Sequence, residues 1–347
     1  MQKYEIDYVA TYSPVVRIEA VRLVLIIGLT RGLEIRHVDF VTAFLNGELV
    51  DVDIYMAQPE GYDDKSGRVC KLKKGLYGLK QASRIWNDTL HKYLTEIDFT
   101  QCTYDLGIYW KQGRVGVVYL TVYVDDLLLA GKMEDISVVI LELAKKFKLK
   151  DLGRVHNFLG MEVNYKPGSI ICLSQTAYIE RLAEKFGLAS ARPVRSPQMH
   201  NETPEPIEQD ADKINDPALP YREIIGSLPY LVACTRPDMA NVVRTLGRYA
   251  GAYTAHNYDQ AKRAIRCVVA TKNLGEVFLL DKRAAESGLE AFADADHARC
   301  PETSQIPRAI FHERRSPWPS ATSPPAAKQV LQCESSGSGC PSQRPPA

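Results

Sequence analysis

The chain has 347 residues, a formal net charge of +1, and 45% hydrophobic and 24% charged residues, an ordinary globular balance large enough for two compact domains or one multi-lobed unit. A near-neutral total excludes a strongly basic protein but still permits a local basic channel. The longest apolar stretch, Val21–Leu29, is too short to span a bilayer, and the first residues lack the apolar core of a signal peptide. The eight cysteines form no CxxC pair or zinc spacing, which indicates reduced thiols in an intracellular protein.

Apolar periodicity and turn residues predict an alternation of helices and strands up to residue 187. Helices are predicted over 16–33, 81–97, 134–148 and 175–187. Strands are predicted over 35–40, 53–58, 69–72, 107–111, 115–124, 127–130, 157–165 and 170–173. Hairpin turns are expected at Gln112–Arg114 and Lys166–Ser169, and Asp125 and Asp126 fall at a third tight turn.

The composition changes after residue 190. Six prolines among acidic and polar residues predict a linker over 191–220. Three helices are then expected near 221–233, 237–251 and 256–273, before a pair of strands at 275–280 and 289–293. Nine of the 20 prolines lie in the last 47 residues, where periodicity disappears. This pattern predicts a disordered tail over 306–347.

Three aspartates have the setting of a site for divalent metal ions. Asp39 ends one predicted strand, and Asp125 and Asp126 stand in a hairpin turn with strongly apolar strands on both sides. Joining a 3′-hydroxyl to the α-phosphate of a nucleotide develops negative charge that two metal ions stabilise, and Mg²⁺ prefers carboxylate oxygens. An isolated Asp-Asp pair is more often a solvated turn. The apolar flanks and the separate Asp39 strand favour the metal site.

Eight short motifs occur in order along the chain. They are Tyr12–Arg17, Val38–Gly47, Tyr55–Tyr62, Lys71–Ala82, Tyr123–Asp126, Phe158–Glu162, Ile225–Leu228 and Thr235–Asp238. This ordered set resembles the reverse transcriptases of copia-type long-terminal-repeat retrotransposons, over about residues 5–300. The resemblance implies an α+β right-hand polymerase fold, with an antiparallel palm sheet, partial fingers and a helical thumb or connection.

The resemblance also implies a division of the chain. Residues 1–190 would form fingers, palm and the start of the thumb, 191–220 the linker, 221–285 the helical thumb or connection, and 286–305 a vestigial start of a ribonuclease H domain, followed by the 306–347 tail. In that vestige Asp294 would be the first metal ligand. His297 stands where the family carries tryptophan, and the further acidic ligands have no counterpart, so hybrid-strand cleavage is expected to be absent.

The resemblance assigns roles to individual residues. Asp39, Asp125 and Asp126, with the backbone carbonyl of Phe40, would hold two Mg²⁺ ions, for which Mn²⁺ could substitute. The nucleotide-binding set would be Arg17, Phe44, Gly78, Lys80 and Gln81, with the Phe44 ring excluding a ribose 2′-hydroxyl. The primer and template set would be Tyr123, Phe158, Leu159 and Gly160, the last three in a primer-grip hairpin.

Several of these residues have a second interpretation. Phe44 could be plain core packing, and Gly78–Gln81 an ordinary loop that begins a helix. Arg17 could contact either the incoming triphosphate or a structural acid. Two basic clusters could be solvated faces or phosphate contacts; they are Lys71, Lys73, Lys74, Lys80 and Arg84, and Lys145, Lys146, Lys148, Lys150 and Arg154.

The chain also departs from the family pattern. It begins downstream of the family's basic fingers hairpin, Ser83 replaces a usual proline, and the tail after about Gln305 resembles translation in a shifted frame. The predicted function is therefore that of an RNA-directed DNA polymerase acting on a primed RNA or DNA template with deoxynucleoside triphosphates, in a partial or weakly active copy.

Two other hypotheses stay open. One is a catalytically dead retrotransposon relic that retains a folded nucleic-acid-binding domain, and the other is an RNA-templated RNA polymerase, which Phe44 disfavours. Neither a membrane role nor an oligomeric state is indicated. Localisation follows from the resemblance alone, which implies a cytoplasmic particle or the nucleus.

Overall fold

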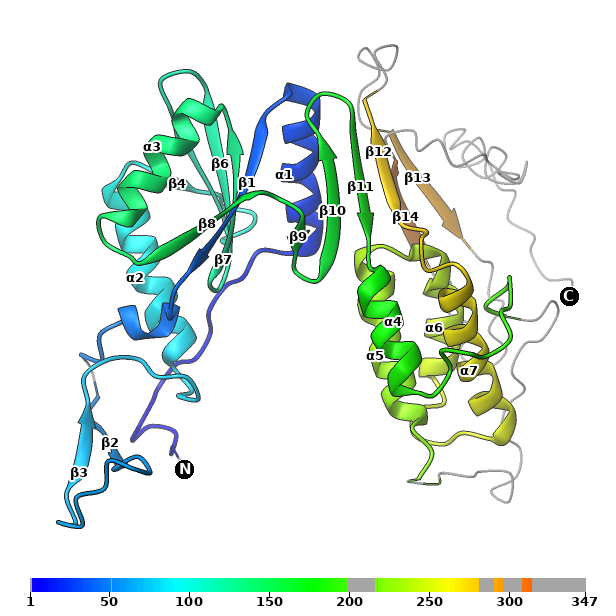
Figure 1. The fold of residues 1–347 in the computed structure, drawn as a ribbon, viewed down its shortest axis with the longest axis horizontal. Coiled ribbons are helices and arrows are strands. Elements are labelled where there is room, and N and C mark those ends of the chain that lie inside the picture. Colours follow the sequence, from blue (N-terminus) through cyan, green and yellow to red (C-terminus); the bar gives the residue numbers. More distant parts are fainter. Residues whose placement is uncertain are drawn as a thin grey trace, which may run out of the picture.

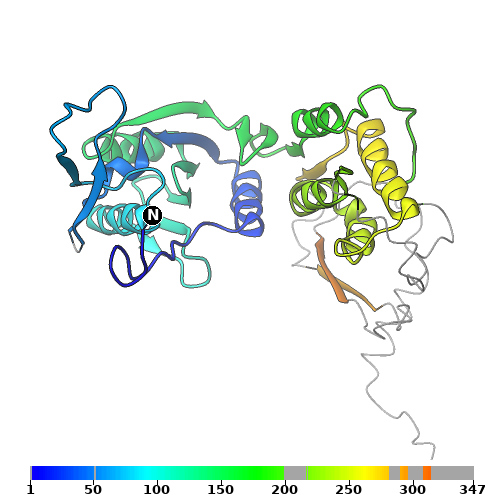
Figure 2. The ribbon, with the colours of Figure 1, turned by 90° about the horizontal axis from the view of Figure 1, so that it is seen from below.

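A computed structural model describes residues 2–50, 52–198, 216, 218–280, 290–295 and 308–313. Two bodies stand apart in it, one built around a six-stranded sheet and the other around helices, with helix α1 and a second sheet between them (Figure 1). The view from below shows the same separation (Figure 2). Within the described residues, no helix is both long and apolar enough to cross a membrane.

The larger sheet is antiparallel, with the strand order β4-β5-β6-β7-β1-β8. Its strands are β1 (Glu34–Phe40), β4 (Thr100–Gln101), β5 (Ile108–Gln112), β6 (Val117–Tyr123), β7 (Asp126–Gly131) and β8 (Leu149–Arg154). Helices α2 (Ala82–Glu96) and α3 (Met133–Ala144) pack on one face. Because side chains alternate between faces along a strand, residues such as Val38, Phe40 and Leu127 form a buried core with these helices.

The opposite face of this sheet is covered over only part of its length. Helix α1 (Ile18–Arg31) and strands of the second sheet pack on Ile35, Leu128 and Ala130, all fully buried. The second sheet has the order β12-β11-β10-β9, with β9 (Asn157–Phe158), β10 (Met161–Lys166), β11 (Ile170–Ser174) and β12 (Glu276–Leu279). The outer end of this sheet face therefore remains available for polar groups.

The second body contains helices α4 to α7 and a 3₁₀ turn around a core of its own. The elements are α4 (Thr176–Lys185), α5 (Tyr221–Cys234), η3 (Pro237–Met239), α6 (Ala240–Gly247) and α7 (Ala255–Ala270). Arg22 of α1 ties this body to the sheet side, because its guanidinium donates to the Ala233 carbonyl at 2.6 Å and pairs with Glu276 of β12 at 2.9 Å. Arg236 is buried and pairs with Asp238 at 2.8 Å, which fixes the turn after α5.

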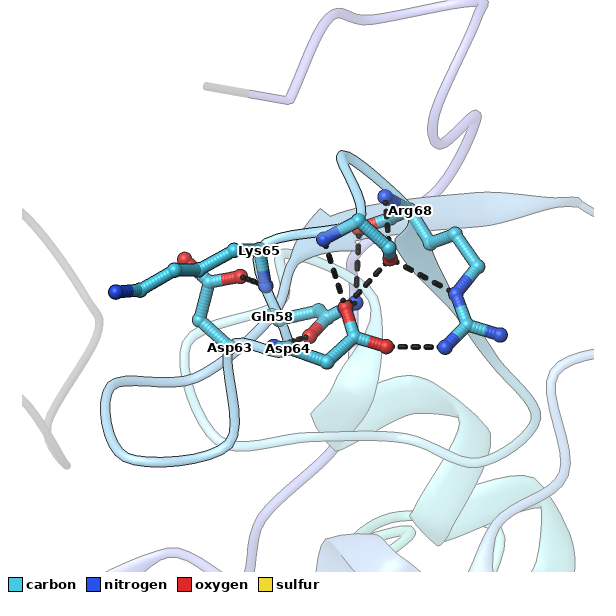
Figure 3. Close-up of polar contacts among 6 residues, drawn as sticks. Gln58, Asp63, Asp64, Lys65 and Arg68 are labelled. Atoms are coloured by element: carbon cyan, nitrogen blue, oxygen red, sulfur yellow. Dashed lines mark hydrogen bonds and ion pairs between the residues drawn. The ribbon is translucent and has the colours of Figure 1, made fainter.

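A separate hairpin extends from the sheet body near the N-terminus (Figure 1). Its strands β2 (Ile54–Ala57) and β3 (Val69–Leu72) follow the 3₁₀ turn η1 (Ala43–Asn46). The loop between them is organised around the Asp64 carboxylate, which accepts hydrogen bonds from Gln58, Ser66 and Arg68 (Figure 3). Exposed hydrogen bonds therefore shape this loop.

An α+β fold with antiparallel sheets is confirmed, and most predicted elements lie within a few residues of their expected bounds. Three expectations need correction. The strand predicted over 157–165 is interrupted at Leu159 and Gly160, which both have positive φ. Strands near 275–280 and 289–293 do not pair with each other, because β12 joins β11 while β13 (Glu290–Ala295) joins β14 (Arg308–Glu313). Strand β14 also lies inside the tail that was predicted to be disordered.

Other predictions fall outside the description. The structure does not describe the linker residues 199–215 and 217 or the tail from 314 onward. It also leaves out most of the predicted ribonuclease H vestige, including His297. Asp294 belongs to strand β13, but its side chain is likewise outside the description. Strand β8 was not predicted, because Leu149–Arg154 is largely polar and lacks alternation.

Candidate active site

The three aspartates predicted to act together lie at one end of the central strands of the larger sheet. We call this end, with Asp39, Asp125 and Asp126, the acidic edge. Strands β6 and β7 are joined by the two-residue turn Val124-Asp125, and Asp126 begins β7. Asp39 on β1 lies directly opposite Asp126, so the two side chains share a face of the sheet. On the other side of β1, the exposed Lys150 of β8 lies opposite Asp39.

The polar character of this edge follows from strand alternation. Ile35, His37 and Asp39 occupy one face of β1, while Asp126, Leu128 and Ala130 occupy the same face of β7. Helix α1 and the second sheet cover the apolar members of this set. The carboxylates lie beyond that cover and remain partly exposed. One continuous sheet face thus supplies apolar core at one end and acidic groups at the other.

Buried groups hold the turn from behind. The Phe40 N–H donates to the Asp125 carbonyl at 2.9 Å, and the indole Nε1 of Trp86 donates to the Val124 carbonyl at 2.7 Å. Val124 has φ +58, a left-handed conformation that strains a β-branched residue. The Phe40 ring meets Trp86 edge-on at 5.0 Å. These contacts compensate for the strain and fix the height of the two aspartates.

The electrostatics of the edge are those of crowded acids. Burial, followed by the charges of Asp126 and Asp39, raises the pKa of Asp125. Burial and the charges of Asp125 and Asp39 also raise the pKa of Tyr77. Asp39 and Asp125 therefore lie close enough to influence one another, and Tyr77 lies near both. A cation that reduced this repulsion would bind favourably.

The third carboxylate is engaged differently. Asp126 Oδ1 lies 2.9 Å from His37 Nε2, and the His37 ring packs edge-on against Phe158 at 5.5 Å. Among the described residues, no group of three or more His, Cys, Asp or Glu side chains converges with the geometry of a metal site. The chemistry of Asp39 and Asp125 suits a hard divalent cation, while Asp126 points to His37.

The predicted nucleotide-binding residues divide into two groups. Phe44 lies in η1 and packs on Tyr77 with ring centroids 4.5 Å apart, beside the carboxylates. The loop bearing Tyr77 is pinned to η1 by the hydrogen bond from the Gly75 N–H to the Gly47 carbonyl at 2.8 Å. Gly78 has φ +97 with open space where a Cβ would stand, so its glycine is required by backbone conformation. Phe44 and Gly78 are thus brought next to the acidic edge.

Gln81, Lys80 and Arg17 are placed less directly. Gln81 is only 7% exposed, and its amide accepts from Gln2 at 3.0 Å and donates to the Asp7 carbonyl at 2.9 Å. These contacts join the start of α2 to the N-terminal segment of the chain. Lys80 is exposed, as is Arg17, whose backbone N–H donates to Asp105 at 3.1 Å. The Arg17 backbone contact leaves both interpretations of its guanidinium open.

Phe158 ends β9, and Leu159 and Gly160 form a tight turn before β10. Phe158 is buried, and the Tyr230 hydroxyl of α5 donates to the Leu159 carbonyl. Tyr123, the first residue of the Tyr123–Asp126 motif, is 38% exposed on the final position of β6. The predicted primer and template residues therefore lie on both sheets, Tyr123 in the larger sheet directly before the aspartates and Phe158 in the second sheet.

Three residues of this region were missed by sequence reasoning: His37, Tyr77 and Tyr230. His37 precedes Asp39 by two positions, so strand alternation alone places it on the same face. Tyr77 directly precedes Gly78 inside a quoted motif. Tyr230 carried no local signal, because its partner Leu159 is 71 residues away in the chain.

Residues 1–200 match the family described as reverse transcriptase (RNA-dependent DNA polymerase). The chain belongs to this family. It is 38% identical over 86% of its length to the retrovirus-related Pol polyprotein from transposon RE1 of Arabidopsis thaliana, and 33% identical over 86% to that from transposon TNT 1-94 of Nicotiana tabacum. The resemblance to copia-type retrotransposon reverse transcriptases is confirmed.

The match differs in extent among relatives. The chain spans about a fifth of the two plant polyproteins, 20% and 23% of their lengths. It is also 30% identical, over 75% of its length, to the putative transposon Ty5-1 protein of Saccharomyces cerevisiae, of which it covers 83%. The match therefore covers a segment of two long polyproteins and most of a shorter transposon protein.

Proposed function

We propose that the chain carries an RNA-directed DNA polymerase site that extends a primer on an RNA or DNA template from deoxynucleoside triphosphates. The observation that carries this proposal is the pairing of Asp39 with Asp126, beside Asp125, at the uncovered edge of an antiparallel sheet. The larger sheet with α2 and α3 would be the palm, the β2–β3 hairpin part of the fingers, and the α4–α7 body the thumb or connection. Family membership supports the same assignment.

Reverse transcriptases of this family use divalent metal ions, and we propose two Mg²⁺ ions, with Mn²⁺ as a substitute. Asp39 and Asp125 would hold them, with Asp126 and the carbonyl of Phe40. When bound, the ions would stabilise the negative charge that develops as the new phosphodiester bond forms.

The remaining chemistry falls to positioning by the chain. Trp86 and Phe40 hold the Val124-Asp125 turn, so the carboxylates stay at a fixed height above the sheet. The Phe44 ring, backed by Tyr77, would lie under the sugar of the incoming nucleotide and exclude a 2′-hydroxyl. The exposed Lys150 ammonium, opposite Asp39, would contact phosphate oxygens. Tyr123 and the Phe158–Gly160 turn would bind the primer end.

Primer extension tests this proposal directly. The purified chain is incubated with poly(rA)/oligo(dT) and Mg²⁺ or Mn²⁺, and we expect weak extension with deoxynucleotides. Asp125→Asn should reduce the rate on the order of 10³-fold or more, because it removes a metal-binding carboxylate. The control is Asp88→Asn, which removes an exposed carboxylate of α2 that pairs with Arg84 at 3.6 Å.

The outcomes separate the competing hypotheses. The polymerase proposal would be overturned if Asp125→Asn still extended the primer at the wild-type rate. It would also be overturned if the wild-type chain extended no primer with either metal, and the inactive relic would then remain. Extension with ribonucleotides that is as efficient as with deoxynucleotides would overturn the role given to Phe44.

A further inference from the structure

Tyr230 joins the helical body to the turn between β9 and β10. It lies on α5, and its hydroxyl donates to the backbone carbonyl of Leu159 in the turn between β9 and β10. The ring also packs edge-on against Tyr178 of α4 at 5.0 Å. The Tyr230 side chain therefore connects helices α4 and α5 to the turn between β9 and β10.

The turn is built to receive this hydroxyl. Leu159 and Gly160 both have left-handed backbone conformations, with φ +48 and +69. A Cβ on Gly160 would collide with the Tyr230 hydroxyl oxygen. Only glycine allows the turn to adopt this conformation and leaves space for Tyr230.

The same turn reaches the carboxylates by a short path. Phe158, directly before Leu159, packs edge-on against His37 at 5.5 Å, and His37 Nε2 lies 2.9 Å from Asp126. The Tyr230 hydroxyl is also near the Tyr123–Asp126 motif: burial, then the neighbouring Cys234, raises the pKa of Tyr230 to about 12, and Tyr123 adds to that rise. The turn that Tyr230 contacts is thus connected to Asp126 through Phe158 and His37.

From this arrangement we propose that Tyr230 is a positioning residue for the primer terminus, which fixes the Leu159–Gly160 turn so that the α4–α7 body and the aspartates hold the same primer end. This inference rests on the proposed function. It adds a residue outside the quoted motifs and gives the helical body a role in placing the 3′-hydroxyl. Without the Tyr230 hydroxyl, the chain should still bind a duplex, but its preference for a recessed 3′ end should be reduced.

The test measures binding, so it does not depend on the rate of catalysis. Affinity is determined by fluorescence anisotropy, with Mg²⁺ present, for a primer–template with a recessed 3′ end and for a blunt duplex of equal length. The quantity compared is the ratio of the two dissociation constants. The wild-type chain is expected to prefer the recessed end.

Tyr230→Phe keeps the ring and removes the hydroxyl. It should lower the recessed-end preference about three- to tenfold, the loss that one hydrogen bond produces, with blunt-duplex affinity unchanged. The matched control is Tyr178→Phe, which removes a hydroxyl that donates to the Ser227 carbonyl at 3.0 Å inside the helical body. This control should keep the wild-type preference.

Gly160→Ala provides a second variant, because its methyl group meets the Tyr230 hydroxyl and its side chain strains the left-handed turn that this hydroxyl contacts. It should reduce the preference at least as much as Tyr230→Phe. An unchanged preference in Tyr230→Phe, or an equal loss in Tyr178→Phe, would overturn the role of Tyr230 and leave the polymerase proposal standing. A wild-type chain with no recessed-end preference would instead overturn the proposed primer site, and the inference with it.

Discussion

The turn between β6 and β7 and the loop between β2 and β3 both carry acidic side chains at the end of a hairpin, but they are held in opposite ways. The first rests on buried strands, with Leu120, Val122 and Leu127 at most 2% exposed. Its shape is fixed by the buried indole of Trp86. The second rests on the Asp64 network at the surface, where the side chain of its partner Arg68 is 75% exposed.

The difference shows which acidic turn can serve as a rigid site. The stability that comes from packing in a dense core changes little with salt or pH. Exposed ion pairs add little to the free energy of folding, and salt screens them. Hydrogen bonds from Ser66 and then Arg68 lower the pKa of Asp64, so its partners favour the charged form. Burial raises the pKa of Asp125, so its surroundings penalise charge. Of the two turns, only the one that carries Asp125 therefore favours the binding of a cation.

The largest effect is expected where the buried support is removed. Trp86→Phe leaves the Val124 carbonyl without its donor and leaves a small void, which should lower the free energy of unfolding by about 2–3 kcal/mol. Urea denaturation followed by circular dichroism measures this loss. Trp110→Phe is the matched control, because Trp110 on β5 is 43% exposed. Equal losses in the two variants would contradict the idea that the turn is held from the core.

The sequence was informative where a pattern is local. Apolar runs on both sides of Asp125 and Asp126 predicted β6, β7 and their turn. It failed where distant segments decide the structure: β12 joins β11 about a hundred residues earlier in the chain, and β8 is a polar edge strand whose pairing with β1 supplies what its own pattern lacks. The Asp126–His37 contact was missed for a related reason. Strand register predicts which side chains share a face, but not which partner a carboxylate selects.

Glu162 is intermediate between these two turns, because it is a partly buried carboxylate held by hydrogen bonds. Its carboxylate accepts from Ser174 Oγ at 2.6 Å and from the Ala177 N–H at 2.8 Å, so it caps the N-terminus of α4. Burial alone would raise the pKa of Glu162, but these hydrogen bonds outweigh it and lower the pKa. A lowered pKa in the folded state means that the stabilisation is present above the unfolded value, about 4.3, and is lost as the pH falls through the folded value.

Glu162→Gln should therefore destabilise the protein by about 1 kcal/mol at neutral pH, and the difference from wild type should shrink at acid pH. Urea midpoints measured at neutral pH and in the acid range give this comparison. Glu184→Gln, at an exposed position on the same helix, should have little effect. A Glu162→Gln deficit that stays constant down to the lowest accessible pH would show that the carboxylate does not act through its charge.

The smallest global effect is expected at the exposed loop. Asp64→Asn removes the charge that Arg68 and Ser66 contact, so the loop should open locally while the urea midpoint stays at the wild-type value. Trypsin cleavage after Lys65 or Arg68 should become several-fold faster. Asp63→Asn is the control, because Asp63 accepts a hydrogen bond from the Lys65 N–H at 2.9 Å and does not contact Arg68 in the way that Asp64 does.

Salt distinguishes this loop from the carboxylate turn. Raising the ionic strength should speed cleavage of the wild-type loop towards the Asp64→Asn rate, since an exposed ion pair is screened. It should leave the stability loss of Trp86→Phe unchanged, because that loss arises from a buried hydrogen bond and packing. Cleavage that is insensitive to both the substitution and salt would mean that backbone turns alone hold the loop. The two hairpins would then differ in burial but not in the kind of force that shapes them.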